Sequence, residues 1–131
     1  VMLDAAAGLL PRLRDLMDRQ QFHEALESLW VVIRAANGYV DRQAPWALKK
    51  TDPARMHVVL YVLAETIRHL AILTQPFMPA ASARLLDQLA VAADRRSCTH
   101  LGAADALVSG TSLPKPEGVF PRFVESEEGV A

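Results

Sequence analysis

The 131-residue sequence contains a single cysteine, few aromatic residues and almost no net charge. Because Cys98 has no second cysteine to pair with, an internal disulfide and a cysteine-based zinc cluster are excluded. A lone, inert cysteine fits a reducing, cytoplasmic compartment. With 14 basic and 15 acidic residues, no overall field attracts nucleic acid, so any such binding must be local.

Long hydrophobic runs and targeting signals are also absent. The apolar runs at 29–33 and 58–64 are much shorter than the roughly 18 residues of a membrane span, so we expect a soluble protein without a membrane partner. The first 15 residues lack the pattern of a secretory signal. The sequence opens on Val1 in mid-pattern, which favours a piece of a longer protein, although a processed terminus would look the same.

The chain has little that could carry catalysis. It lacks a glycine-rich phosphate loop, a nucleophile elbow and a paired cysteine motif. Its four histidines show no spacing of four residues that would place two imidazoles on one helical face, so we interpret them as hydrogen-bonded or solvent-edge residues. Arg95, Arg96 and His100 form a small basic cluster that we interpret as a solvated turn. We therefore predict no catalytic residue, no metal and no cofactor in this chain.

Hydrophobic periodicity predicts an all-α fold, an antiparallel helix bundle in one domain. A helical pattern over residues 3–19 contains Gly8 and Pro11, so its regular part should begin near Pro11 or bend there. The short connection at Gln20 and Gln21 favours an antiparallel neighbour. The next helix begins at Phe22, with this expected buried stripe: Phe22, Leu26, Leu29, Ile33, Ala36 and Val40. Trp30 lies between stripe positions and is expected in the core.

A second long helix is predicted to begin at Thr51 or Asp52, either of which can cap it, with Pro53 in its first turn. Apolar residues on several sides indicate that this helix is central and covered on more than one face. Its expected buried stripe is Met56, Leu60, Leu63, Ile67, Leu70 and Thr74. Pro76 ends it, and a shorter helix runs from Pro79 to Leu89, with Ala83, Leu86 and Leu89 or their neighbours inward.

The remaining sequence is polar and rich in proline. Residues 94–109 could form one short helical turn, and no segment alternates cleanly enough to be a strand. From Leu113 three prolines predict an extended strip over the bundle, anchored by Phe120 and Phe123. We therefore divide the chain into a helical domain, 1–112, and a C-terminal tail, 113–131, whose end should be mobile.

Trp46 stands outside any apolar periodicity, in the stretch NGYVDRQAPWALKK at 37–50. Pro45 biases Ala44 away from helical geometry, so the preceding helix should end near Arg42 or Gln43 and turn the indole outward. An exposed indole can stack on a nucleotide base, and Arg42, Lys49, Lys50 and Arg55 are nearby cations that could contact phosphates. The alternative, that Trp46 folds back over the end of the core, is common for tryptophan and stays open on the pattern alone.

These residues resemble the C-terminal anticodon-binding domain of methionyl-tRNA synthetases, which are class I aminoacyl-tRNA synthetases. The family pattern is Asn, a variable residue, Tyr, then Ala-Pro-Trp or Glu-Pro-Trp with a Leu-Lys pair, followed by Pro-Phe-Met-Pro; it is present at 37–49 and 76–79. The closing VFPRF resembles the family's Leu-Phe-Pro-Arg-Ile ending. The similarity covers nearly the whole chain, although the Pro-Phe-Met-Pro part is shared with the synthetases for leucine, isoleucine, valine and cysteine.

The resemblance implies the helical anticodon-binding fold and an anticodon reader. In the family the tryptophan of this block stacks on the first anticodon base, a cytosine, which assigns that role to Trp46 with Pro45 holding the corner. Asn37 and Asp41 match positions that shape or border the site. The implied partners are the anticodon loop of methionine tRNA, with its CAU anticodon, and the catalytic domain of the same parent chain, a methionine–tRNA ligase that uses ATP and Mg²⁺; DNA is not an expected partner.

The sequence also departs from the family pattern. The family reads the cytosine with an Asn and an Arg on an earlier helix, in a stretch resembling Asn-Leu, two residues, Arg, and no such stretch is present. The His-Ile-Gly-His and Lys-Met-Ser-Lys-Ser motifs of the catalytic domain are absent too, so the chain should be inactive alone. Gly38 stands where relatives often have Arg. Without the earlier helix, part of an apolar helix face should be exposed, with self-association as a consequence.

Two other readings stay open at this point. A helical protein-interaction module would use Trp46 as a hydrophobic anchor, and its binding would not depend on RNA, Lys49 or Lys50. The equivalent domain of a sister class I synthetase would share the fold and read another anticodon.

Overall fold

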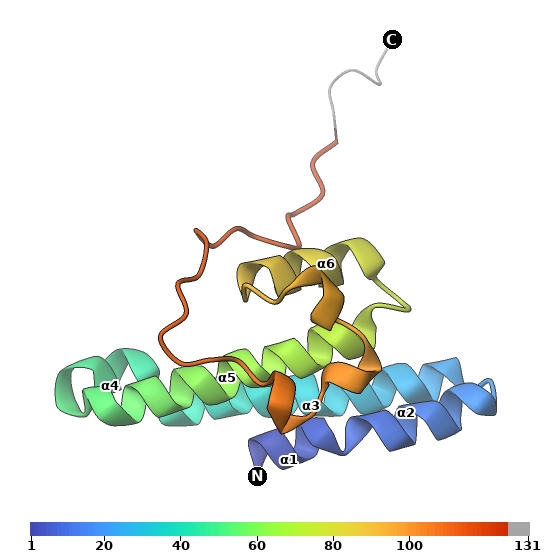
Figure 1. The fold of residues 1–131 in the computed structure, drawn as a ribbon, viewed down its shortest axis with the longest axis horizontal. Helices are drawn as coiled ribbons and strands as arrows, with labels where there is room; N and C mark the ends of the chain where they lie inside the picture. The colour runs from blue at the N-terminus through green and yellow to red at the C-terminus, as the bar shows by residue number, and fades with distance from the viewer. Residues whose placement is uncertain (126–131) are drawn as a thin grey trace.

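A computed structural model describes residues 1–125 as a bundle of helices without a strand in that range (Figure 1). The α-helices are α1 (Met2–Ala7), α2 (Leu9–Asp18), α3 (Phe22–Gln43), α4 (Pro45–Thr51), α5 (Pro53–Thr74) and α6 (Pro79–Gln88). Three short 3₁₀ helices follow, η1 (Ala93–Arg95), η2 (Cys98–His100) and η3 (Ala103–Asp105). The predicted all-α class is confirmed.

The two long helices, α3 and α5, run antiparallel and are joined at one end by α4 (Figure 1). Helices α1 and α2 pack on α3, α1 also packs on α5, and α6 packs on α5 from another side. The break predicted near Pro11 occurs at Gly8, which separates α1 from α2, and Pro11 stands in the first turn of α2, where its missing N–H is harmless. The turn into α3 includes Gln20 in a left-handed conformation, φ 56°.

The buried face of α3 is rotated from the predicted stripe. Trp30, expected in the core, is 52% exposed, and Phe22 and Leu26 are exposed as well. The buried residues are Ala25, Ser28, Leu29 and Val32. Small side chains at 25 and 28 let α2 approach closely, and Arg12 Nε donates to Ser28 Oγ at 2.8 Å across this contact. The face of α3 that packs against its neighbours is therefore the one with small side chains, whereas the hydropathy pattern predicted the face with bulky ones.

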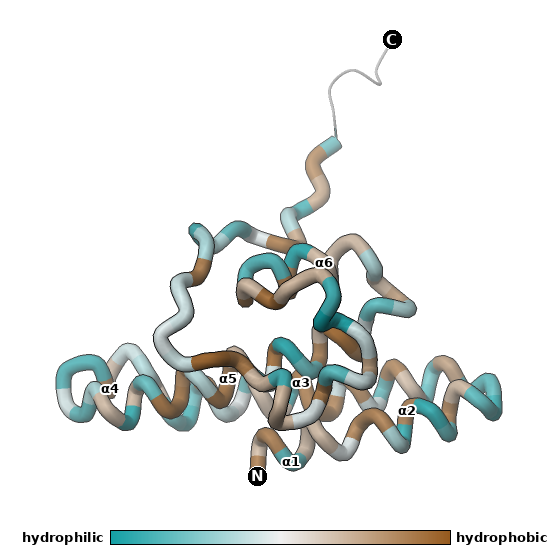
Figure 2. Tube along the Cα trace, viewed as in Figure 1, coloured by the Kyte–Doolittle hydropathy of each residue, from teal (hydrophilic) through white to brown (hydrophobic). Residues whose placement is uncertain are grey.

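The C-terminal half of α5 is covered on several sides, as predicted, but of the expected stripe only Thr74 is fully buried. Leu60 and Ile67 of the expected stripe are exposed. The buried residues are Val59, Glu65, Thr66, Arg68, His69, Ala71, Ile72, Leu73 and Thr74. Among the described residues, α5 is the one helix whose length and composition would suit a membrane span, a test that the buried core helix of a soluble protein also passes. Figure 2 shows its apolar residues interrupted by hydrophilic ones.

Residues 96–113, which we call the strap, cross the bundle beside α5 and α6, and the chain then leaves as an extended tail (Figure 1). The predicted tail anchors are wrong, because Phe120 and Phe123 are 65% and 90% exposed. Hydrogen bonds hold the tail instead: Gln88 Nε2 donates to the Glu117 carbonyl at 2.8 Å, and the Glu117 amide donates back to Gln88 Oε1 at 3.1 Å. Most of the predicted mobile end, 126–131, lies outside the described residues.

Candidate nucleic-acid interface

Helix α3 ends at Gln43, as the sequence predicts, and the chain turns at Ala44. Ala44 is left-handed, with φ 43° and ψ 64°, a conformation that is unusual for a residue with a side chain. Its amide donates to the Val40 carbonyl at 2.9 Å, which closes the last turn of α3. Pro45 then occupies the first position of α4. We call residues 44–52 the corner.

Helix α4 is an element that the sequence analysis missed. The Ala47 and Leu48 amides both donate to the Ala44 carbonyl, at 2.9 and 3.2 Å, so the helix starts directly at the proline. Pro45 predicts the end of one helix, and proline also suits the first position of the next. As a result, Trp46 stands on a short helix and is 62% exposed. The outward orientation of the indole is confirmed, and the alternative that it covers the core is wrong.

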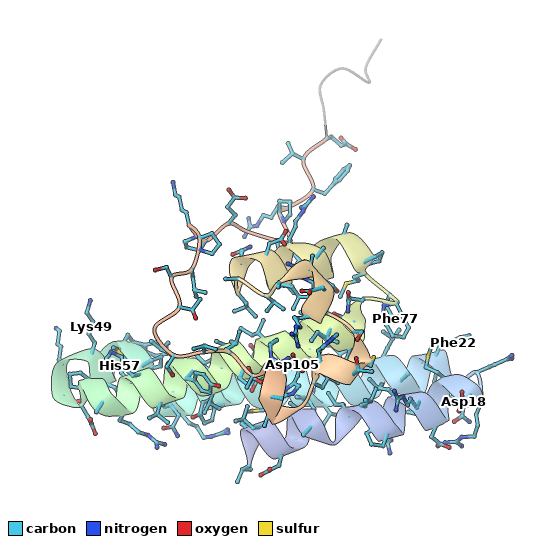
Figure 3. All side chains as sticks on the ribbon, in the orientation of Figure 1. Asp18, Phe22, Lys49, His57, Phe77 and Asp105 are labelled. Carbon is cyan, nitrogen blue, oxygen red and sulfur yellow. The ribbon has the colours of Figure 1, made fainter. Side chains whose placement is uncertain are left out.

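Three cations lie in or beside the corner, and none of them has an ion-pair partner in the described residues. Lys49 and Lys50 are exposed in the last turn of α4, and Figure 3 shows Lys49 at this end of the molecule. Arg42 is exposed and lies against Gly38, where a Cβ would meet Arg42 Nη1 at 3.0 Å. Within residues 1–125, none of the three forms an ion pair. Their charge is therefore available to an anionic ligand.

Asn37 and Asp41 lie one helical turn apart on α3, and both are exposed. Their spacing of four residues places them on one face of the helix, which leads to the corner. Arg42 follows Asp41 by one residue, about 100° further round the helix, and so lies on a different side beside Gly38. The spacing thus places Asn37 and Asp41 on one face of α3 and Arg42 on the adjoining one.

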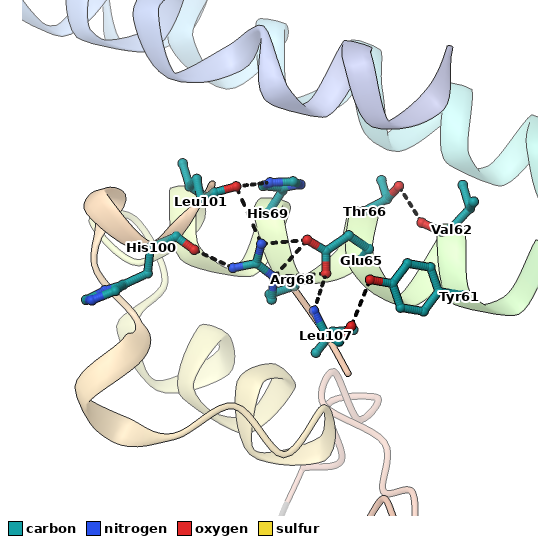
Figure 4. Close-up of polar contacts among 9 residues, drawn as sticks. All are labelled: Tyr61, Val62, Glu65, Thr66, Arg68, His69, His100, Leu101 and Leu107. Carbon is teal, nitrogen blue, oxygen red and sulfur yellow. Dashed lines mark hydrogen bonds and ion pairs between the residues drawn. The ribbon is translucent and has the colours of Figure 1, made fainter. Parts of the chain in front are cut away.

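A second polar cluster, which we call the buried network, lies in the C-terminal half of α5 (Figure 4). Arg68 is 1% exposed and Glu65 is 4% exposed. Arg68 Nε donates to both carboxylate oxygens of Glu65, at 3.1 and 3.0 Å, and its Nη1 donates to the His100 carbonyl in the strap. The Leu107 amide donates to Glu65 Oε2 at 3.0 Å. Each charge of the pair therefore binds the strap as well as its partner.

His69 and Tyr61 extend the buried network. His69 Nε2 is 2.8 Å from the Leu101 carbonyl, and because a carbonyl can only accept, this nitrogen carries the proton. Its Nδ1 has no partner in the described part of the chain. Tyr61 donates its hydroxyl to the Leu107 carbonyl at 2.7 Å. The network was missed from the sequence, although two opposite charges three residues apart inside an apolar helix are a readable signal.

The predicted basic turn is also a structural feature, and less solvated than expected. Arg95 pairs with Asp105 at 2.9 Å, and Arg96 pairs with Asp87 at 2.7 Å and donates to the Val91 carbonyl. The Arg96 side chain is mostly buried, so its interpretation as a solvated residue is wrong. Cys98 is exposed. Within residues 1–125, no group of three or more His, Cys, Asp or Glu residues gathers as metal ligands would.

We compared the sequence and the fold with those of known proteins. The family model described as the anticodon binding domain of methionyl tRNA ligase matches residues 2–129. A methionine–tRNA ligase of Mesorhizobium japonicum is 52% identical over 95% of this chain, and that of Rhizobium meliloti is 52% identical over 96%. In both cases the match covers 24% of the relative, so the chain spans about a quarter of the relatives' length.

Solved structures give the same result. The apo methionyl-tRNA synthetase of Mycobacterium tuberculosis superposes with a TM-score of 0.89 at 42% identity, covering 95% of this chain and 26% of that one. The same enzyme bound by methionyl-adenylate gives 0.87 at 43% identity, covering 92% of this chain and 24% of that one. The antiparallel bundle described above is therefore shared with these synthetases.

Proposed function

The chain belongs to the family of anticodon-binding domains of methionyl-tRNA ligases, and on this premise we propose that its corner binds the CAU anticodon of methionine tRNA. Binding there would select and orient the tRNA for a catalytic domain elsewhere in the ligase, which attaches methionine in a reaction that consumes ATP with Mg²⁺. We place this ligase in the cytoplasm. The assignment to a sister class I synthetase is not supported, because both the family and the relatives are those of methionine.

The exposed indole of Trp46 is the observation that carries the proposal. An aromatic residue that is 62% exposed on a short helix contributes little to the core, whereas it offers a flat apolar surface to a ligand. Single-stranded anticodon bases can be splayed out and stacked on such a surface, which is worth about 1–3 kcal/mol per base. Pro45 limits the directions that the indole can take, because its ring restricts the backbone at the start of α4.

The groups around Trp46 suit two further kinds of contact, with phosphates and with base edges. Lys49, Lys50 and Arg42 are exposed cations without ion-pair partners in the described residues, and they suit phosphate contacts. Asn37 and Asp41 present an amide and a carboxylate on one face of α3, and both groups can hydrogen-bond to the edge of an unpaired base. Local cations of this kind can bind RNA although the chain has a net charge of −1.

A separate face of the molecule suits the rest of the ligase. Phe22, Leu26 and Trp30 are exposed and lie four residues apart, which lines them along one stripe of α3. The nearby Arg34 is paired with Glu27 at 2.6 Å, so the stripe offers no free cation to a phosphate. Because the chain corresponds to about a quarter of its relatives, we assign this stripe to contact with the remaining part of the ligase, including its catalytic domain.

A titration of anticodon stem-loops tests the proposed function. The loop carrying CAU and the same loop carrying UAU are each titrated against the protein and against Trp46→Ala. We expect a preference for CAU, and about a tenfold or greater loss of affinity in Trp46→Ala. Trp30→Ala is the matched control, because it removes another indole that is more than half exposed from the same bundle, at a site away from the corner. It should bind CAU as the unchanged protein does.

Each outcome is informative. Equal losses in Trp46→Ala and Trp30→Ala would indicate a general effect of removing tryptophan and would contradict the proposed site. If the protein binds neither loop, the titration is repeated with the complete ligase, and a second failure to bind CAU ends the proposal. Binding that is unchanged by salt and by the anticodon would favour a protein-interaction module instead.

A further inference from the structure

We infer that Arg55 is a positioning residue for the anticodon site: its guanidinium ties α5 to the end of α3 and so holds the corner that presents Trp46. The inference rests on the proposed function and deepens it. Proximity in the sequence alone groups Arg55 with the cations near Trp46. The geometry separates it from them, because the Arg55 guanidinium is hydrogen-bonded to Gln43 at the end of α3.

The hydrogen bonds of Arg55 span the base of the corner. Its Nη2 donates to Gln43 Oε1 at 3.0 Å, and Gln43 is the last residue of α3. Its backbone amide donates to Asp52 Oδ1 at 3.0 Å, which is the N-terminal cap of α5. One residue therefore connects the end of α3, the cap of α5 and, through them, both ends of the segment that carries α4.

The corner packs against α5, but no residue of α4 is fully buried, so a hydrogen bond at its base adds to a contact that burial supports only in part. Helix α4 has seven residues and none of them is buried, while an isolated helix of that length is unstable in water. Both of its ends are non-helical joints, Ala44 with φ 43° and Asp52 with φ −150° and ψ 79°. If α3 and α5 move apart at this end, the direction of Trp46 changes with them. A binding surface that is held in place before the ligand arrives loses less entropy on binding.

Arg42 provides the contrast within the same site. Both arginines are exposed and close to the corner, yet in the described residues the Arg42 guanidinium makes no hydrogen bond or ion pair. We therefore assign Arg42 to phosphate contact and Arg55 to positioning. The two roles predict different salt dependence, because only the loss of a phosphate contact lowers the number of counterions that binding releases.

The first experiment needs no RNA. Amide hydrogen exchange is measured for Ala47, Leu48 and Asp52, whose amides hydrogen-bond within the corner, in the unchanged protein and in Gln43→Ala and Arg55→Gln. We expect both variants to exchange faster at these amides by about threefold or more, with exchange in α6 unchanged. Arg42→Gln, the matched control, should leave the corner amides as they are.

The second experiment measures affinity for the CAU stem-loop across a range of salt concentrations. Gln43→Ala and Arg55→Gln should each weaken binding about threefold without changing the slope of log affinity against log salt, and the double variant should be no weaker than either single one. Arg42→Gln should instead make this negative slope shallower by about 0.7. Gln43→Ala carries the most weight, because it removes no charge.

The outcomes separate the inference from the proposed function. If Arg55→Gln makes the salt slope shallower while Gln43→Ala changes neither binding nor exchange, Arg55 contacts phosphate directly. The inference is then overturned while the anticodon site stands. Unchanged exchange in both variants also overturns it. If exchange rises as expected and no stem-loop binds even to the complete ligase, the tie exists and the proposed function fails.

Discussion

The two ends of helix α5 carry similar residue types in opposite settings. Next to its beginning, Lys49 and Lys50 are exposed at the end of α4, and Asp52 caps α5 at the surface. Toward its end, Glu65 and Arg68 are almost fully buried, and both hydrogen-bond to each other and to the strap. One end leaves cations available to a ligand, whereas the other uses its charges to hold a loop.

The difference teaches that a charged side chain indicates a binding site only where it is exposed and has no hydrogen-bond or ion-pair partner within the protein. Arg68 is the more unusual residue, since a buried charge costs several kcal/mol to desolvate, yet its donors face Glu65 and two strap carbonyls. Lys49 and Lys50 are ordinary surface residues, but within residues 1–125 they have no ion-pair partner. We therefore propose the ligand site at the corner, next to the beginning of α5, and assign the buried network a structural role.

Breaking the buried network should have the largest effect on stability. Arg68→Met leaves the Glu65 carboxylate buried without its cation, which should lower the free energy of unfolding by about 3–5 kcal/mol, measured by urea denaturation. The double variant Glu65→Leu with Arg68→Met removes both charges and should be more stable than Arg68→Met alone. A loss below about 1 kcal/mol in Arg68→Met would contradict the structural role of the pair.

A gentler change at the same network should have a moderate effect. Tyr61→Phe removes the hydroxyl that donates to the Leu107 carbonyl, and we expect a loss of about 1 kcal/mol in the free energy of unfolding. The control is Tyr39→Phe, because Tyr39 is also partly buried and its hydroxyl makes no hydrogen bond in the described residues. Equal effects of the two substitutions would show that the bond to the strap adds nothing.

At the corner, relieving the backbone should slightly raise stability. Ala44→Gly removes the side chain from a residue with φ 43°, a conformation that glycine adopts without steric strain. We therefore expect a gain of about 0.5–1 kcal/mol in the free energy of unfolding. Ala35→Gly is the control, since Ala35 is an exposed residue inside the right-handed α3, and it should cost about 1 kcal/mol. A loss in Ala44→Gly as large as that in Ala35→Gly would mean that the left-handed turn carries no strain.

Sequence reasoning predicted the local geometry of the corner more accurately than the residues of the core. The end of α3, the Asp52 cap and the outward Trp46 all follow from proline and capping chemistry, which acts between residues close in the chain. Which residues of α3 are buried could not be read in this way. The helix contains apolar residues over much of its circumference, so several stripes are almost equally apolar, and neighbouring helices decided among them.

The buried network shows the same limit in another form. Glu65 and Arg68 are visible in the sequence as charges inside an apolar helix, but their burial depends on carbonyls and an amide of a strap that lies more than 30 residues further along the chain. The roles of Asn37, Asp41, Arg42 and the lysines remain predictions, which rest on the resemblance to the family and on exposure.

By itself, the sequence determined the helical class, the proline-directed corner with its outward tryptophan and the family, because these depend on local backbone preferences and on short blocks of residues. Only the tertiary structure decided which faces of α3 and α5 are buried, that Arg68 and Glu65 bind the strap, and that Arg55 spans the corner while Arg42 does not. These features depend on which distant groups come within hydrogen-bonding distance, and that is a property of the packed bundle.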